Sequence, residues 1–282
     1  MPTPKKTALR CLVLTALSIA AFLPAIAEGA KVYTIGIIPS APPVTMHKLW
    51  LPVADLLAAK TGLEFRLVHY DKMAEFERDI QGGGPDFIFS SPIQLVVAHA
   101  SSGYVPLVRA EKPVAIGLFV RGDSSIHDLG DLEGKRISFV GSKNLCSVTM
   151  RYLLSQYKKD LSFAIEYVGS TRNVIINVLL GKSDAASVFL PELDLESGET
   201  RAQLREIVET PQIASHPLSA HPRLPQAVRQ AVTKAILSIA ETADGAALLA
   251  TLRLATPVTA DYARDYKVLE EMDIKELTDW GR

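Results

Sequence analysis

Short apolar runs typical of strands alternate with helical patterns along the first third of the chain, and this alternation constrains the fold more than any other feature. The expected strands are residues 32–38, 63–68 and 86–89, and the expected helices are 49–60, 73–80 and 90–99. A helix between successive strands is the pattern of parallel sheets, because the crossover must return to the same edge. The sequence therefore predicts an α/β fold with a mainly parallel sheet, and a rigid loop at Pro42 and Pro43.

A second unit of the same kind follows. Its expected strands are residues 117–120, 136–140, 164–168, 185–189 and 206–210, and its expected helices are 150–157 and 172–180. A proline-rich stretch, 211–225, then leads into a mostly helical tail. We expect two lobes around a cleft: lobe 1 from 28–118 plus 209–282, and lobe 2 from 119–208. Ligands of such sheets bind at the carboxyl ends of the strands.

The N-terminal segment has the order of an export signal. Basic residues precede an uncharged apolar stretch at 11–23, which Ala25-Ile26-Ala27 follows as a small-x-small cleavage pattern. Removal of residues 1–27 takes away three basic residues and no acidic one, which changes the formal net charge from −1 to −4. This charge excludes the basic excess typical of nucleic-acid binding. We expect an exported periplasmic protein with no nucleic-acid partner.

Cleavage near Ala27 would leave Cys146 as the only cysteine, so no internal disulfide holds the fold. Cys146 lies in a polar loop, 141–149, between an expected strand and an expected helix. Free N–H groups and the positive dipole end at a helix start favour an anion or polar ligand, and they lower the pKa of a thiol there. The alternative, with about equal weight, is a small buried core residue.

Other candidate ligand-binding residues are polar side chains at expected helix starts or cleft loops: Ser90, Ser91, Asn144, Ser147, Ser170, Thr171, Arg172, Thr45 and His47. Serine and asparagine at such positions also serve as helix N-caps, with no ligand involved. Arg172 has the geometry to hold an oxyanion with two hydrogen bonds, although surface arginines are more often solvated or ion-paired. His47 is either a ligand partner or an exposed side chain.

Several motifs together resemble one family, the periplasmic solute-binding proteins of the phosphate, phosphite and phosphonate type that serve ABC importers. They are Gly36-Ile37-Ile38-Pro39, Gly84-Pro85-Asp86-Phe87-Ile88-Phe89-Ser90-Ser91-Pro92, Asp131-Leu132-Glu133-Gly134-Lys135, Gly169-Ser170-Thr171 and Gly181-Lys182-Ser183-Asp184-Ala185-Ala186. The resemblance covers nearly all of the expected mature chain. It implies a two-lobed, type II-like periplasmic binding protein fold that closes on a small ligand without catalysis or cofactor, and a membrane ABC permease as partner.

The chain departs from this family at its expected ligand site. Typical members have a Ser-Thr-Ser-Gly run where this chain has Asn144-Leu145-Cys146-Ser147, and Phe189 stands where aminophosphonate-binding members have an acidic residue. The stretch 44–47 offers no tyrosine. With one cysteine in place of hydroxyls, the expected pocket is similar to that of arsenite-binding sensor proteins, which work with a histidine kinase. A thiol is a suitable ligand for As(III).

Three functions follow from these features. The first is a periplasmic protein that binds a small oxyanion or an arsenite-like metalloid, with Cys146 as the As(III) ligand, for a sensor kinase or a permease. The second is the phosphate or phosphonate component of an ABC importer. The third, less favoured, is an enzyme with Cys146 as nucleophile, which needs a base such as His47 or His99 from across the cleft.

The first prediction concerns export. N-terminal sequencing of the protein from the periplasm is expected to begin at or near Glu28, because the Ala25-Ile26-Ala27 pattern follows the apolar stretch. Recovery of protein that still carries residues 1–27 would contradict the signal peptide.

Overall fold

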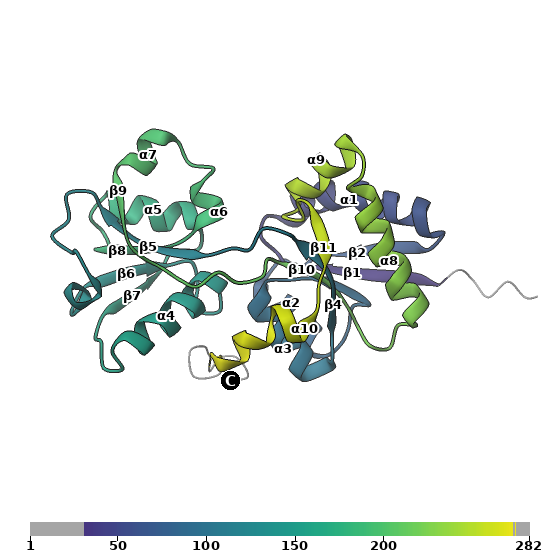
Figure 1. Cartoon of the computed structure of the whole chain (residues 1–282), viewed down its shortest axis with the longest axis horizontal. Coiled ribbons are helices and arrows are strands. Elements are labelled where there is room, and N and C mark those ends of the chain that lie inside the picture. Colours follow the sequence, from purple (N-terminus) through teal and green to yellow (C-terminus); the bar gives the residue numbers. More distant parts are fainter. Residues whose placement is uncertain (1–30, 273, 275–282) are drawn as a thin grey trace, which may run out of the picture. The chain divides into compact units, whose positions relative to one another are not determined.

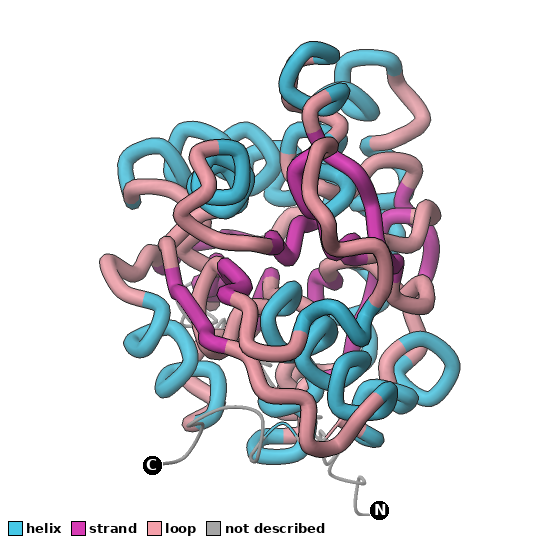
Figure 2. Tube along the Cα trace, turned by 90° about the vertical axis from the view of Figure 1, so that its left-hand side faces the viewer, coloured by secondary structure: helices cyan, strands magenta, loops and turns pink. Residues whose placement is uncertain are grey.

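The computed structural model describes residues 31–272 and 274, so the predicted signal peptide lies outside the described residues. Strands in this part of the chain form two separate sheets, and helices lie outside the strands (Figures 1 and 2). None of the helices described is long and apolar enough to cross a membrane.

The first sheet has six strands in the order β11-β4-β10-β3-β1-β2. Its strands are β1 (Val32–Ile37), β2 (Glu64–Val68), β3 (Phe87–Phe89), β4 (Val105–Ala110), β10 (Pro217–Ala220) and β11 (Pro257–Thr259). β1 pairs in parallel with β2 and β3, whereas β10 runs antiparallel to β3 and β4, and β11 runs antiparallel to β4. The chain thus returns to its first sheet in the opposite direction.

Helices on this sheet come from both ends of the chain. They are α1 (Pro43–Thr61), α2 (Met73–Gln81), α3 (Pro92–Ser102), α8 (Gln226–Ile239), α9 (Ala243–Thr251), α10 (Tyr262–Asp265) and the 3-10 helix η2 (Lys267–Glu271). α1 packs against α8, and α2 against α3. The tail therefore covers the sheet that the N-terminal part begins.

The second sheet has the order β7-β6-β8-β5-β9. Its strands are β5 (Ile116–Arg121), β6 (Arg136–Phe139), β7 (Ala164–Tyr167), β8 (Ala185–Phe189) and β9 (Leu204–Glu209). Its helices are α4 (Leu145–Tyr157), α5 (Thr171–Leu179), α6 (Leu190–Leu193), α7 (Gly198–Ala202) and the 3-10 helix η1 (Leu129–Leu132). β6 is parallel to β7 and β8, and β5 is antiparallel to β8 and β9.

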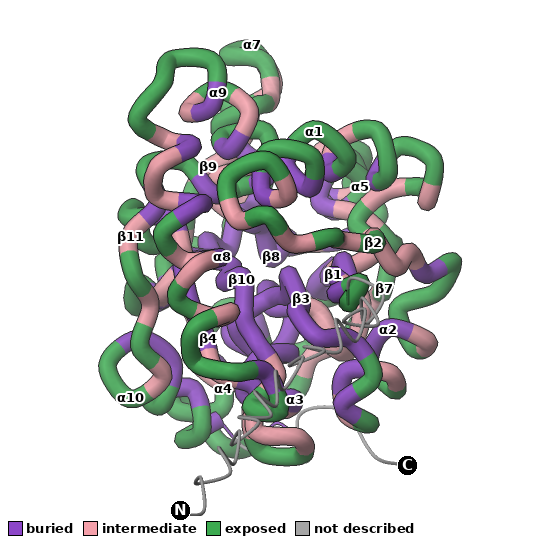
Figure 3. Tube along the Cα trace, turned by 90° about the vertical axis from the view of Figure 1, so that its right-hand side faces the viewer, coloured by how far each residue is buried: buried purple, intermediate pink, exposed green. Residues whose placement is uncertain are grey.

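The core lies along the central strands, where β1, β3 and β10 are buried while the outer faces of the helices are exposed (Figure 3). Trp50 on α1, Phe76 on α2 and Phe139 on β6 are among the largest side chains removed from solvent. Burial of one such side chain contributes about 3 kcal/mol to the stability of the fold. Each sheet is thus held mainly by the apolar faces of its helices.

The structure corrects three sequence expectations. The first sheet is mixed rather than mainly parallel, because the chain returns to it in the antiparallel strands β10 and β11. β10 lies within the proline-rich stretch, and Pro217 opens it, a place where proline is tolerated in a sheet. Pro43 is the first residue of α1 rather than part of a loop, since proline at this position needs no N–H partner. α4 begins at Leu145, five residues before the expected start, because Asn144 caps it.

The expected lobe boundaries, between residues 118 and 119 and between 208 and 209, fall inside β5 and β9. These two strands are paired with each other and carry the chain into and out of the second sheet. Whether the two lobes move as units on ligand binding stays a prediction.

A buried ion cluster ties the C-terminal segment to the first sheet. The Asp265 carboxylate, 5% exposed, accepts hydrogen bonds from Arg109 on β4 at 3.2 Å and from Arg264 at 2.9 and 2.7 Å. The Asp261 N–H also donates to it at 2.8 Å. Although burial alone opposes ionisation, these donors hold the pKa of Asp265 well below its ordinary value.

The second prediction follows from this cluster. A lowered pKa means that the stabilisation is fully present above about pH 4, the unfolded value, and is lost as the pH falls below it. Asp265→Asn is expected to lower the free energy of unfolding at pH 7 by about 3 kcal/mol. Between pH 7 and pH 3, the free energy of unfolding of this variant should fall less than that of the wild type, because the variant has no carboxylate to protonate here. Urea unfolding at pH 7 and pH 3 measures both effects.

A matched control is Asp123→Asn, which removes an ion pair with Arg121 that is mostly exposed. This substitution should leave the free energy of unfolding nearly unchanged, because solvent screens an exposed ion pair. Equal losses in the two variants would contradict the stabilising role of the Asp265 cluster.

Candidate functional site

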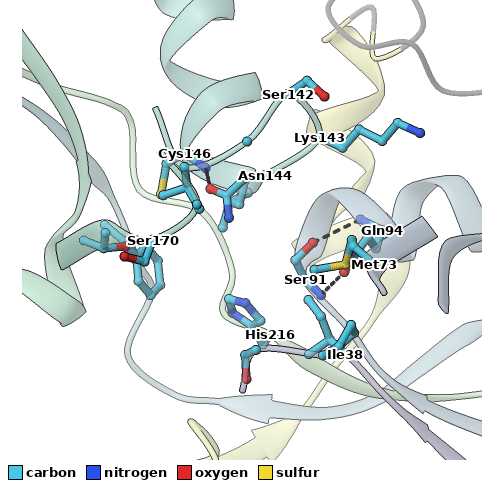
Figure 4. Close-up of a pocket in the computed structure, with 18 of the residues that line it drawn as sticks. Ile38, Met73, Ser91, Gln94, Ser142, Lys143, Asn144, Cys146, Ser170 and His216 are labelled. Carbon is cyan, nitrogen blue, oxygen red and sulfur yellow. Dashed lines mark hydrogen bonds between the residues drawn. The ribbon is translucent and has the colours of Figure 1, made fainter. Parts of the chain in front are cut away.

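A cavity of about 520 Å³ is lined by residues from the elements of both sheets (Figure 4). Ile38, Met73 and Ser91 belong to the first sheet and its helices, and Cys146 and Ser170 belong to the second. A volume of this size is in the range of small-molecule sites. The cavity is therefore the candidate ligand site.

The first residues of four helices line this cavity: Met73 and Ala74 of α2, Ser91 and Gln94 at α3, Asn144, Leu145 and Cys146 at α4, and Ser170 and Thr171 at α5. The N-terminus of a helix carries free N–H groups and a partial positive charge. Four such ends directed to one cavity make its field positive.

The sequence produces this arrangement locally. Each of the four helices follows the carboxyl end of a strand: α2 after β2, α3 after β3, α4 after β6 and α5 after β7. Parallel strands end at one edge, so the helices that follow them start there. Before α5, Gly169 has φ +85°, a conformation that glycine adopts readily, and it turns the chain into the Ser170 cap.

Three predicted site residues are helix caps that also line the cavity. The Ser91 hydroxyl accepts from Gln94 N–H at 3.3 Å, Asn144 Oδ1 accepts from Cys146 N–H at 2.9 Å, and the Ser170 hydroxyl accepts from Asn173 N–H at 3.2 Å. Capping uses the acceptor of each side chain and leaves its O–H or N–H₂ donors. The two sequence interpretations, cap and ligand contact, are therefore compatible.

Among the described residues, four charged side chains line the cavity and form two ion pairs, each between elements of different sheets. Lys143 Nζ lies 3.4 Å from Glu77 on α2, and Arg253 Nη2 lies 2.5 Å from Glu192 on α6. Lys143 precedes α4 of the second sheet, and Arg253 follows α9 of the first. The side-chain charges thus cancel, and the positive field of the helix ends is what remains.

Arg253 has a backbone conformation that is uncommon for a residue with a side chain. It has φ +61°, in the left-handed region, and follows Leu252, the C-terminal cap of α9. Its guanidinium also lies 5.5 Å from the centre of the Phe189 ring. The fold maintains strain at this residue, and such strain concentrates at functional sites.

His216 lies in the cavity wall between two aromatic rings, with Phe89 and Phe189 each 6.0 Å away, centre to centre. It is 5% exposed, and its ring contacts within the described part of the chain are with aromatic rings. Burial, reinforced by the Arg253 charge, lowers the pKa of His216 to about 3. At physiological pH, this imidazole is a neutral hydrogen-bonding group.

Cys146 lines the cavity as the second residue of α4 and is 3% exposed. The expectation of a lowered thiol pKa was wrong: burial raises the pKa of Cys146, and the Glu192 charge adds to this. Desolvation of the thiolate outweighs the helix dipole here. The thiol is therefore protonated. Cys146 is buried like a core residue and also lines the cavity, so both sequence interpretations describe part of its environment.

Half of the predicted site residues line the cavity: Cys146, Asn144, Ser91, Ser170 and Thr171. Their roles in ligand binding stay predictions. The others lie outside the lining. Ser90 and Ser147 are buried, and their hydroxyls have no hydrogen-bond partner within the described residues.

The remaining three predicted residues face solvent. Arg172 pairs with Glu196 at 3.3 Å and its side chain is 73% exposed, as for an ordinary surface arginine. Thr45 is exposed on the first turn of α1, and exposed His47 contacts His69 with 3.0 Å between Nδ1 and Nε2.

Sequence reasoning missed the charged pairs and His216. These residues come from segments far apart in the chain, and no local motif marks them. The proline-rich stretch around His216 indicated only a loop, whereas the residue directly precedes β10. Only the pairing of β10 with β3 brings it to the cavity.

Neither histidine proposed as a catalytic base lines the cavity. His99 Nδ1 lies 2.7 Å from the Tyr104 carbonyl, and its ring stacks on Tyr262. His47 contacts His69, as above. Within residues 31–272 and 274, no group of three or more His, Cys, Asp or Glu side chains is arranged to hold a metal ion.

Comparison with solved structures identifies the fold. A Xanthomonas citri protein bound to ATP is 16% identical with a TM-score of 0.75, and the match covers 89% of this chain and 99% of that one. PhnD1 from Prochlorococcus marinus in complex with methylphosphonate is 16% identical with a TM-score of 0.73, covering 88% and 99%. The α/β, two-sheet periplasmic binding protein fold is thereby confirmed.

A third solved structure is a binding-protein component of an ABC phosphonate transporter from Pseudomonas aeruginosa, 14% identical with a TM-score of 0.60 and covering 83% of this chain and 82% of that one. Comparison with curated protein sequences gave no match. A family model described as "ABC transporter, phosphonate, periplasmic substrate-binding protein" matches residues 35–266. The chain belongs to this family of periplasmic substrate-binding proteins.

Proposed function

We propose that the protein binds a tetrahedral phosphorus oxyanion of the phosphonate class in the cavity and delivers it to the permease of an ABC importer. The observation that carries this proposal is the meeting of four helix N-termini at one cavity. Each N-terminus acts as roughly half a positive charge, and together they favour an anion.

The donors around the cavity fit the same ligand. An oxyanion needs N–H and O–H groups directed at its oxygens, and the caps Ser91, Asn144 and Ser170 retain theirs. These side chains are fixed by their capping bonds, so little ordering is needed when the ligand binds. The donors come from both sheets, which fits a ligand held by both halves of the protein.

Arsenite is a second candidate, because the Cys146 sulfur lines the cavity and thiols bind As(III). In this form the partner is a sensor histidine kinase rather than a permease. The reactive species is the thiolate, and burial raises the thiol pKa. The described cavity lining offers no second cysteine. These observations favour the oxyanion.

The third prediction concerns the ligand. Calorimetric titration with phosphate, phosphite, methylphosphonate, arsenate, arsenite and antimonite is expected to show tight binding of a phosphorus oxyanion. Ser170→Gly should weaken it about tenfold, because glycine tolerates the cap position but lacks the hydroxyl donor.

The matched control is Ser197→Gly, since Ser197 caps α7 by the same bond to the third N–H but lies outside the cavity lining. This variant should bind like the wild type. A response to arsenite or antimonite alone would reject the oxyanion proposal.

The fourth prediction separates the two candidates at Cys146. Serine is close in size to cysteine and lacks the soft sulfur, so Cys146→Ser should keep oxyanion affinity within about threefold, or improve it by restoring a hydroxyl. The same titrations measure this. Loss of binding on this substitution, with an unchanged melting temperature, would instead support the thiol as a ligand.

A further inference from the structure

Both carboxylates of the cavity are engaged by cations of the protein. Glu192 Oε1 lies 2.5 Å from Arg253 Nη2, and the Arg253 guanidinium is also held over the Phe189 ring. A ligand ammonium group would have to displace a guanidinium that has two partners. Glu192 is therefore not available to a positively charged ligand.

Glu77 is engaged in the same way from the other side. Its side chain is 4% exposed and lies 3.4 Å from Lys143. Separation of this pair would leave a buried carboxylate without its cation, which is costly. Both carboxylates of the described lining are thus already paired with a cation of the protein, and Phe189 adds none.

The neutral part of the wall combines polar caps with apolar side chains. Ile38, Met73, Val140, Leu145 and Phe189 contribute to it. His216, the one polar ring of the described lining, is uncharged and held between Phe89 and Phe189. An uncharged group is the appropriate partner for such a surface, because a charge placed there would be desolvated without compensation.

The volume exceeds what an inorganic ion needs. The cavity volume of about 520 Å³ is in the range of sites that hold whole small molecules. A bare phosphate is a single tetrahedral ion and would leave most of this space to solvent. The remaining volume, next to the apolar wall, is room for a substituent.

We propose that the ligand is a monosubstituted phosphorus oxyanion whose substituent is uncharged and apolar: an alkyl- or arylphosphonate, or the phosphate monoester of the same shape. This inference rests on the proposed function and specifies its ligand. The helix N-termini hold the oxyanion, and the apolar wall at Phe189 and Met73 receives the substituent.

The test uses three ligands of nearly equal shape. Propylphosphonate and 2-aminoethylphosphonate differ by a methyl in place of an ammonium group, and ethyl phosphate has an ester oxygen in place of one methylene. Calorimetry is expected to show that propylphosphonate or ethyl phosphate binds at least about tenfold more tightly than 2-aminoethylphosphonate. The comparison between propylphosphonate and ethyl phosphate distinguishes the phosphonate from the ester.

Arg253→Gln tests the reason for this preference. It releases Glu192, so the ratio of the dissociation constants of 2-aminoethylphosphonate and propylphosphonate should fall about tenfold, whatever happens to the overall affinity. The double variant Arg253→Gln with Glu192→Gln removes the released carboxylate and should restore the ratio. Because the ratio is read within each folded variant, general weakening does not affect it.

Equal or tighter binding of 2-aminoethylphosphonate by the wild type would overturn the inference while the proposed function stands. Binding of inorganic phosphate without any substituted ligand would also overturn it. If no phosphorus oxyanion binds, the proposed function itself fails. The wild-type comparison requires no variant to fold.

Discussion

The site depends on one property of the backbone: a helix that follows a strand begins at the strand's carboxyl end with unpaired N–H groups. Four helices do so around one cavity, two on each sheet. The cavity therefore attracts anions before any side-chain charge is considered. The side chains at these starts refine this field, because the caps supply donors with fixed directions.

Side-chain charges have a different role in this cavity. Glu77, Lys143, Glu192 and Arg253 neutralise one another, and each pair joins elements of the two sheets. The pairs therefore connect the two halves at the cavity, while the helix ends give the cavity the positive field that the proposed anionic ligand requires. The Cys146 thiol is protonated and the His216 imidazole is neutral, so neither adds a side-chain charge to the cavity.

The fold was predictable where its signals are local. The β-α alternation located β1, β2, β3, β6, β7 and β8 within a residue or two, and the motifs identified the family. The antiparallel β10 was missed because its partners lie more than 100 residues away, and the proline-rich sequence around it indicates a loop.

The same reasoning explains the site. Caps such as Ser170 are visible in the sequence, because the capping residue and its helix are neighbours. The Glu192–Arg253 pair and the position of His216 depend on contacts between distant segments. The thiol pKa was misjudged at Cys146 for a related reason: the helix start is a local signal, whereas the burial that outweighs it is a property of the tertiary structure.

Arg253 illustrates how such a site constrains the evolution of the chain. A left-handed backbone costs a residue with a side chain roughly 1–2 kcal/mol, and glycine at this helix end would avoid that cost. Glycine, however, has no guanidinium to meet Glu192. Backbone strain alone favours glycine at this position, whereas the proposed discrimination against ammonium groups favours arginine, so the two demands on this residue oppose each other.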